Sequence, residues 1–177
     1  MIKKLTNTEE AVLDHFFRNP DTEIHIRGLA DETDIPYSSV RNAVIELETQ
    51  GLVRKRAESK MTFFSGNRRS DSFKQRKRRS NLRQLAESGV IDEIEDRFRP
   101  DAIVLFGSYL AGTDRSDSDI DIAVINGRTI EIDLSEYEDT LGRSIQLVEI
   151  PDSREESDEF RNTLANGYVL RGYLTVV

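Results

Sequence analysis

Two aspartates separated by one residue, Asp119 and Asp121, carry the strongest chemical signal in the sequence. They begin the segment Asp-Ile-Asp-Ile-Ala-Val, and in a strand of this pattern both carboxylates would share one face. Two like charges about 7 Å apart along a strand destabilise each other unless a divalent cation neutralises them. Hard oxygen ligands suit Mg²⁺, which binds one or two carboxylates together with substrate phosphates. The pair therefore predicts a site for Mg²⁺ or Mn²⁺.

A Gly-Ser turn precedes the aspartates and is expected to follow a buried strand. The apolar run from Ala102 to Phe106 predicts a strand buried on both faces, which ends at Gly107 and Ser108. Glycine lets the backbone approach another group closely. The serine hydroxyl and the amides that open a short following helix are suited to phosphate oxygens.

The string Leu-Phe-Gly-Ser-Tyr-Leu-Ala-Gly-Thr-Asp-Arg-Ser-Asp-Ser-Asp-Ile-Asp contains Gly-Ser, ten residues and then Asp-x-Asp. Over about residues 90–150 the chain resembles the minimal nucleotidyltransferases of the DNA polymerase β-like superfamily. The resemblance implies that Gly107 and Ser108 bind a triphosphate and that Asp119 and Asp121 are catalytic and coordinate metal ions. The implied reaction transfers a nucleoside monophosphate from a nucleoside triphosphate to a hydroxyl and releases pyrophosphate. The alternative is that the acids in this acidic segment have this spacing by chance and take no part in catalysis.

One position departs from the family pattern at the place of a third carboxylate. Relatives usually carry this acid on a later strand, shortly after a Leu-Gly-Arg turn, whereas Gln146 follows 141–143 here. Glutamine adds no negative charge and cannot act as a general base, a role that commonly contributes about 10²–10⁴-fold in rate. Strand alternation places Glu149 on the opposite face from Gln146, and Glu131 and Asp133 are other candidates for the missing acid.

The first third of the sequence has the pattern of three short helices followed by a hairpin. The helices are expected over about 8–18, 26–33 and 36–50, with strands at 52–53 and 61–64 joined by a charged hairpin. Over about residues 5–67 this order resembles the winged helix-turn-helix domains of prokaryotic transcription regulators. The resemblance implies binding of double-stranded DNA through polar residues of the third helix and basic residues of the hairpin: Ser38, Ser39, Arg41, Asn42, Arg54, Arg56 and Lys60.

Charge is distributed unevenly along the chain. The net charge of −8 combines a neutral segment 1–69, a segment 70–99 of net +2 and a segment 100–177 of net −10. Residues 54–83 alone carry twelve Lys or Arg against two acids. Such a local basic block favours a polyanionic partner while the acidic part repels one, although a solvated basic helix and a winged helix that docks on protein both stay open.

Composition sets the class of protein. The chain has 177 residues, no Cys and two His, so disulfides, thiolate zinc sites and a histidine metal cage are excluded and a cytoplasmic location is favoured. Its longest apolar run is far shorter than a membrane span, and no membrane association is expected. The pattern predicts an α+β protein with a winged helix-turn-helix at 1–69, a basic helical connector at 70–89 and a nucleotidyltransferase-like domain with a mixed β-sheet flanked by helices at 90–177.

Three functions follow from this reading. The first is a DNA-binding, Mg²⁺-dependent nucleotidyltransferase whose acceptor hydroxyl lies on a protein, nucleic acid or small molecule. The second is a non-catalytic transcription regulator or antitoxin-like protein that senses a nucleotide or binds a partner through a degenerate site, as Gln146 favours. The third is a docking subunit that contacts only protein. A protein partner and a homodimer are open in each case.

Overall fold

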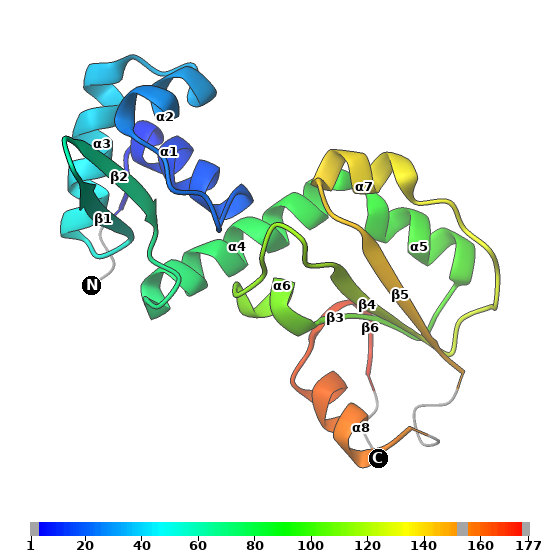
Figure 1. Ribbon diagram of the computed structural model, residues 1–177. Helices are drawn as coiled ribbons and strands as arrows, with labels where there is room; N and C mark the ends of the chain where they lie inside the picture. Colours follow the sequence, from blue (N-terminus) through cyan, green and yellow to red (C-terminus); the bar gives the residue numbers. More distant parts are fainter. Residues whose placement is uncertain (1–3, 152–155, 175–177) are drawn as a thin grey trace. The chain divides into compact units, whose positions relative to one another are not determined.

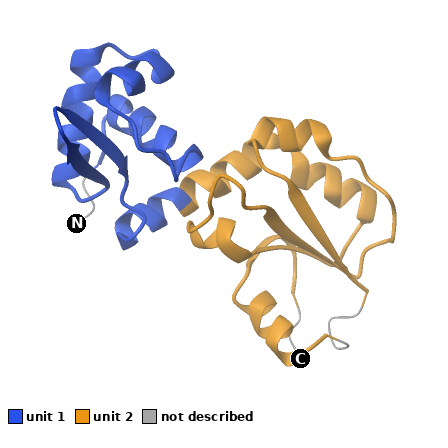
Figure 2. Cartoon of the chain, viewed as in Figure 1, with its two compact units in different colours: residues 1–77 blue, residues 78–177 orange. Residues whose placement is uncertain are grey.

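Residues 4–151 and 156–174 are described in the computed structural model, which separates into two units, residues 1–77 and 78–177 (Figure 2). The α+β class, with an N-terminal winged helix and a C-terminal mixed sheet, is confirmed. The boundary between the units lies inside one long helix, and the boundaries expected from the sequence, at residues 69 and 89, flank that helix.

The first unit has the winged-helix order that the sequence predicts (Figure 1). It consists of α1 (Asn7–Arg18), α2 (Ile26–Thr33), α3 (Tyr37–Thr49) and the antiparallel strands β1 (Val53–Glu58) and β2 (Met61–Gly66). Helix α1 begins with a capping box in which Thr6 and Glu9 satisfy each other's backbone amides. The apolar faces of the three helices pack into one hydrophobic core, in which Phe16, Leu29 and Val40 are fully buried.

The wing differs from the expected hairpin. The sequence-based reading put 54–60 in a charged loop, but β1 pairs continuously with β2 from Val53 to Glu58. The turn is therefore confined to Ser59 and Lys60, and Ser59 has a positive φ of 54°. Charged side chains are tolerated within β1 because every residue after Val53 is exposed, so this strand lacks the alternation that would have identified it.

Helix α4 (Asp71–Ser88) contributes to both units. In the first unit Phe73 is fully buried, with its ring 5.0 Å from that of Phe17. Lys77 is also buried, and its ammonium donates a hydrogen bond to the carbonyl of Phe17. Leu85 belongs to the core of the second unit. The sparse apolar residues of this basic helix thus divide between two cores.

The second unit is built on a four-stranded sheet in the order β5-β4-β3-β6 (Figure 1). Its elements are α5 (Val90–Phe98), β3 (Ala102–Phe106), α6 (Gly107–Ala111), β4 (Ile120–Ile125), α7 (Ser135–Leu141), β5 (Ile145–Ile150), α8 (Asp158–Ala165) and β6 (Tyr168–Gly172). Strand β3 is antiparallel to β4 and β6, and β4 is parallel to β5.

Each face of the sheet carries its own core. Ile120, Ile122 and Val124 of β4 pack in the cluster that includes α5. Ala123 and Ile125 belong to a second cluster, which includes Leu164 of α8. Because side chains alternate along a strand, Asp121 projects to the same face as Ala123, the face that α8 covers.

The end of the chain forms a helix and an edge strand. The sequence predicts a helix over 154–164. In the structure α8 begins at Asp158, and Arg154 lies outside the described residues. Leu170 of β6 packs against the core, whereas Tyr168 and Val169 are 45% and 40% exposed. Within the described ranges, no helix combines the length and the apolar character needed to cross a membrane.

Candidate functional site

The predicted site residues meet at one edge of the sheet. Because β3 runs antiparallel to β4, the end of β3 lies beside the start of β4, and Phe106 pairs with Asp121. Gly107 follows directly and begins α6, which also contains Ser108. Strand β5 continues the same edge, and Gln146 pairs with Asp121. Topology thus brings segments separated by up to 39 residues to one place.

Gly107 and Asp121 approach each other closely. Gly107 has a φ of +75°, a region that side-chain-bearing residues rarely adopt. A Cβ atom at this position would lie 2.1 Å from Oδ2 of Asp121, well inside van der Waals contact. The glycine is therefore required twice, for its backbone conformation and for the space that the carboxylate occupies.

The two aspartates produce an unbalanced negative charge. Asp119 is exposed and Asp121 is half-buried. Burial raises the pKa of Asp121 above its usual value, and the charge of Asp119 raises it further. The two carboxylates repel each other, and a divalent cation would relieve this repulsion. Together they could supply part of the ligand set of Mg²⁺, which takes its other ligands from water and phosphate oxygens. Among the described residues no group of three or more His, Cys, Asp or Glu forms a larger metal-binding cluster.

Gln146 lies beside Asp121, at the position where the family resemblance described above leads us to expect a third acid. Strands β4 and β5 pair without a bulge, so Gln146 and Asp121 share a face while Glu149 lies on the other face. Glu131 is exposed in the segment before α7. The carboxylate of Asp133 accepts the backbone N–H of Ser135 at 3.0 Å, a hydrogen bond that lowers the pKa of Asp133. Asp133 therefore has a structural role at the start of α7.

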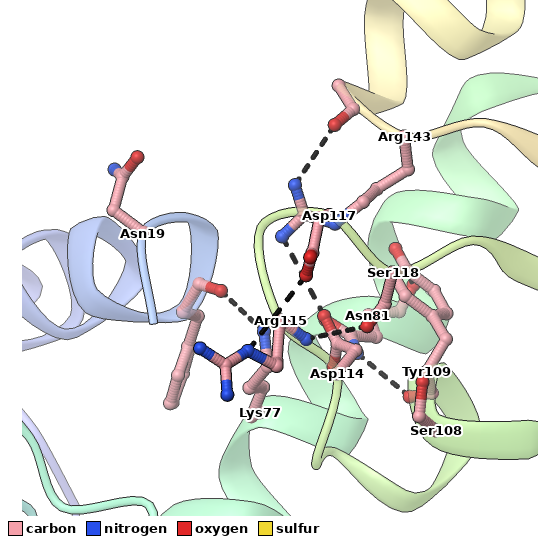
Figure 3. Close-up of polar contacts among 12 residues, drawn as sticks. Asn19, Lys77, Asn81, Ser108, Tyr109, Asp114, Arg115, Asp117, Ser118 and Arg143 are labelled. Carbon is pink, nitrogen blue, oxygen red and sulfur yellow. Dashed lines mark hydrogen bonds and ion pairs between the residues drawn. The ribbon is translucent and has the colours of Figure 1, made fainter. Parts of the chain in front are cut away.

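A buried polar network supports the loop between the Gly-Ser turn and the aspartates, and sequence reasoning did not identify it (Figure 3). Asp114 is 1% exposed, and its Oδ1 accepts the side-chain amide of Asn81 at 3.0 Å. The same amide nitrogen donates to the carbonyl of Tyr109 at 2.8 Å. The guanidinium of Arg143 approaches Oδ2 of Asp114 at 3.8 Å. An acid in a loop has no periodicity that would reveal its burial.

Tyr109 completes this network. It is 3% exposed, and burial raises the pKa of its phenol strongly; Asp114 adds to the rise and Arg143 opposes it. The phenol oxygen donates to the carbonyl of Asn81 at 3.4 Å. The tyrosine therefore stays protonated at neutral pH and ties α6 to α4.

Most residues predicted to contact DNA are solvent-accessible in the first unit. Ser38, Arg41 and Asn42 are exposed on α3, and Ser39 is partly buried on the same helix. Arg54 and Lys60 are exposed on the wing. These side chains form the outer face of the third helix and of the hairpin that follows it.

Arg56 differs from the other wing residues because its guanidinium already has partners. It lies 2.6 Å from a carboxylate oxygen of Glu23 and 2.8 Å from one of Glu58. It also sits 5.4 Å from the ring centroid of Phe63. Contact with a phosphate would have to compete with these ion pairs, which are exposed and therefore weak.

Comparison with known proteins finds a family match for the second unit. Residues 89–170 match the family model described as "Polymerase beta, Nucleotidyltransferase". The match spans 82 of the 177 residues, so residues 89–170 resemble nucleotidyltransferases of this family, next to a first unit with the winged-helix order.

Two further comparisons complete these findings. One solved structure that the chain resembles is that of the adhesin competence repressor (AdcR) from Streptococcus pyogenes. The two have 19% sequence identity and a TM-score of 0.41, over 54% of this chain and 69% of that one. No curated protein matches the chain.

Proposed function

We propose that this protein binds DNA through its winged helix and transfers a nucleoside monophosphate from a nucleoside triphosphate to a hydroxyl acceptor in the presence of Mg²⁺ or Mn²⁺. The observation that carries the proposal is the close approach of Gly107 to the carboxylate of Asp121, with Asp119 directly before β4 and near enough for its charge to raise the pKa of Asp121. A backbone with no side chain beside two carboxylates is a suitable place for a phosphate group and a cation together.

The chain's own residues have separate tasks in this reaction. Asp119 and Asp121 would hold the cation, which would supply positive charge where the phosphoryl group is transferred. Gly107 leaves room for the carboxylate of Asp121, and the hydroxyl of Ser108 would donate a hydrogen bond to an oxygen of the triphosphate. The acceptor oxygen forms a bond to the α-phosphorus while the bond from that phosphorus to the oxygen bridging to the β-phosphate breaks. Pyrophosphate leaves, and the hydroxyl proton passes to solvent because the amide of Gln146 is not a base.

One observation favours a second candidate, a non-catalytic regulator that binds a nucleotide and thereby alters DNA binding. Gln146 lies in register with Asp121, where a third carboxylate would add both charge and a proton acceptor. Loss of that group lowers the rate of transfer and leaves the two-aspartate site intact. In this second candidate, nucleotide binding to the domain alters DNA binding, and no group is transferred to an acceptor.

A transfer assay separates the two candidates. The protein is incubated with labelled nucleoside triphosphates, Mg²⁺ and a cell lysate, and labelled products are resolved by size. The enzyme produces label on an acceptor, and Asp119→Ala abolishes it. No transfer by the wild-type protein, together with nucleotide binding in calorimetry, would establish the regulator instead.

DNA binding has its own test. If six basic residues contact phosphates, the logarithm of the affinity for duplex DNA falls with the logarithm of salt concentration at a slope of about −5. Arg41→Ala on α3 and Arg54→Ala on the wing should each make that slope about one unit shallower. A weak, salt-independent interaction with duplex would favour a winged helix that docks on protein.

A further inference from the structure

A hollow of about 460 Å³ lies beside Gly107 in the second unit. Its lining residues come from the start of this unit's part of α4, from the β3 to α6 junction and from α8: Arg78, Phe106, Gly107, Leu110, Ala111, Asn162, Thr163 and Asn166. Its volume is within the range of sites that hold small organic ligands. Neither of the two aspartates is among its lining residues.

The hollow is adjacent to the two-aspartate site through Gly107. One side of this glycine borders the hollow, and the position of its missing side chain is filled by Oδ2 of Asp121. Phe106, which also lines the hollow, pairs with Asp121 across the sheet. Because α8 covers the face to which Asp121 projects, a group bonded to a phosphate at Gly107 can enter the space between α6 and α8.

Charge distinguishes this hollow from a second one at the same edge of the sheet. The second hollow, of about 410 Å³, is lined by the four acids Asp117, Asp119, Glu138 and Asp139 and by one basic residue, Arg143. The hollow beside Gly107 has no carboxylate in its lining, and its one charged residue is Arg78. Asp119 lines the acidic hollow, so a triphosphate held there with its cation borders that hollow. The three further acids repel additional negative charge, whereas the hollow beside Gly107 has no acid to do so.

The lining chemistry suits a nucleobase. Asn162 lies on α8, Asn166 is the C-cap residue one helical turn later, and both are exposed. An asparagine amide presents a donor and an acceptor side by side, the pattern that pairs with the edge of a base. The side-chain amide of Asn166 donates one hydrogen bond to the backbone carbonyl of Asn162 at 2.7 Å. Leu110 and the partly buried ring of Phe106 supply apolar surface.

We propose that this hollow binds the nucleoside of the triphosphate, with Asn162 and Asn166 hydrogen-bonded to the edge of the base. The inference rests on the proposed function and adds the part of the site that selects the nucleotide. The triphosphate lies at Gly107 and the two aspartates, and the base lies between α6 and α8. The acidic hollow is left for the acceptor.

The test compares nucleotides with inorganic tripolyphosphate, which has the phosphates and no nucleoside. Affinities of ATP, GTP, CTP, UTP and tripolyphosphate are measured by calorimetry with Mn²⁺ for the full chain. The double variant Asn162→Ala with Asn166→Ala should weaken the best nucleotide about tenfold or more and leave tripolyphosphate unchanged. Ala111→Phe, which fills the hollow from α6 and leaves the sequence of α8 unchanged, should have the same selective effect even if the double variant is poorly folded.

Glu159→Ala is the matched control, because Glu159 is an exposed residue of α8 that does not line the hollow. It should preserve all affinities. If neither the double variant nor Ala111→Phe alters nucleotide affinity, or if tripolyphosphate weakens equally, the nucleoside binds elsewhere and this inference is wrong while the proposed function stands. If the wild-type protein binds neither nucleotides nor tripolyphosphate, the proposed function and this inference fail together.

Discussion

Asn81 of α4 donates its amide to the carboxylate of Asp114 at 3.0 Å, although 33 residues separate them in the sequence. The same amide holds the carbonyl of Tyr109 in α6. The side chain of Asn81 therefore holds both α6, through Tyr109, and the loop that leads to Asp119, through Asp114. The geometry of the two-aspartate site depends on this buried contact.

Removal of the buried carboxylate should destabilise the second unit strongly. Asp114→Ala removes the buried carboxylate that the nearly buried guanidinium of Arg143 approaches at 3.8 Å, and it removes one of the two acceptors of the Asn81 amide. We expect the free energy of unfolding to fall by about 3 kcal/mol. Urea denaturation followed by circular dichroism measures the loss. Asp117→Ala is the control, because its pair with Arg115 is exposed and 3.9 Å long; it should cost about 0.5 kcal/mol or less. Equal effects of the two variants would contradict the structural role of Asp114.

A methyl group at Gly107 should disrupt the site, whereas one at Gly142 should not. Both glycines have positive φ, so alanine at either position adds backbone strain of about 1–2 kcal/mol. Only Gly107→Ala brings a carbon atom into the carboxylate of Asp121; nothing lies within 4 Å of the Cβ position at Gly142. We expect Gly107→Ala to weaken binding of Mn²⁺ with a nucleotide at least tenfold in calorimetry. Gly142→Ala should match the wild-type affinity, and comparable losses in both variants would show that strain alone is responsible.

Restoration of an acid beside Asp121 should increase transfer. Gln146→Asp places a third carboxylate in register with Asp121, on an exposed position of β5 that accommodates the charge. A proton acceptor there should raise the initial rate of label transfer about 10²-fold. Glu149→Gln changes the charge on the opposite face of the same strand and should leave the rate unchanged. If Gln146→Asp gains no activity while it still binds nucleotide, the domain lacks more than this one group, and the regulator is favoured.

The first unit should lose stability in mild acid because of His15. This residue is buried in α1, and burial lowers its pKa below the usual 6.5, an effect that Glu32, 3.6 Å away, partly offsets. The folded state therefore binds a proton less readily than the unfolded chain. The stabilising contribution is present above about pH 6.5 and is lost as the pH falls through the lowered pKa of the folded state.

Melting temperatures measured between about pH 8 and pH 5 test this expectation. His15→Leu should flatten the profile in that interval, because it removes the titrating group. Glu32→Gln should steepen it, because the carboxylate that favours the charged histidine is gone. A His15→Leu profile parallel to that of the wild-type protein would assign the acid sensitivity to other groups.

The helices and the central strands were predictable from local patterns. Local sequence patterns identified α1 to α3 and the helical connector that contains α4, and β3 stands out as an uninterrupted apolar run. The wing was predicted less accurately, because β1 is exposed along its length and resembles a charged loop. The two aspartates and the Gly-Ser turn were recognised because their spacing along the chain is itself the signal.

Short-range periodicity suffices for helices, for strands and for the spacing of Asp119 and Asp121, because each depends on neighbours within a few residues. The pairing of Gln146 with Asp121, the burial of Asp114 under Asn81 and the hollow between α6 and α8 depend on sheet register and on contacts between distant segments. Such contacts form only when the strands align and both faces of the sheet are covered. They leave no repeating pattern in the residues that make them, so the folded chain alone decides which side chains surround the aspartates.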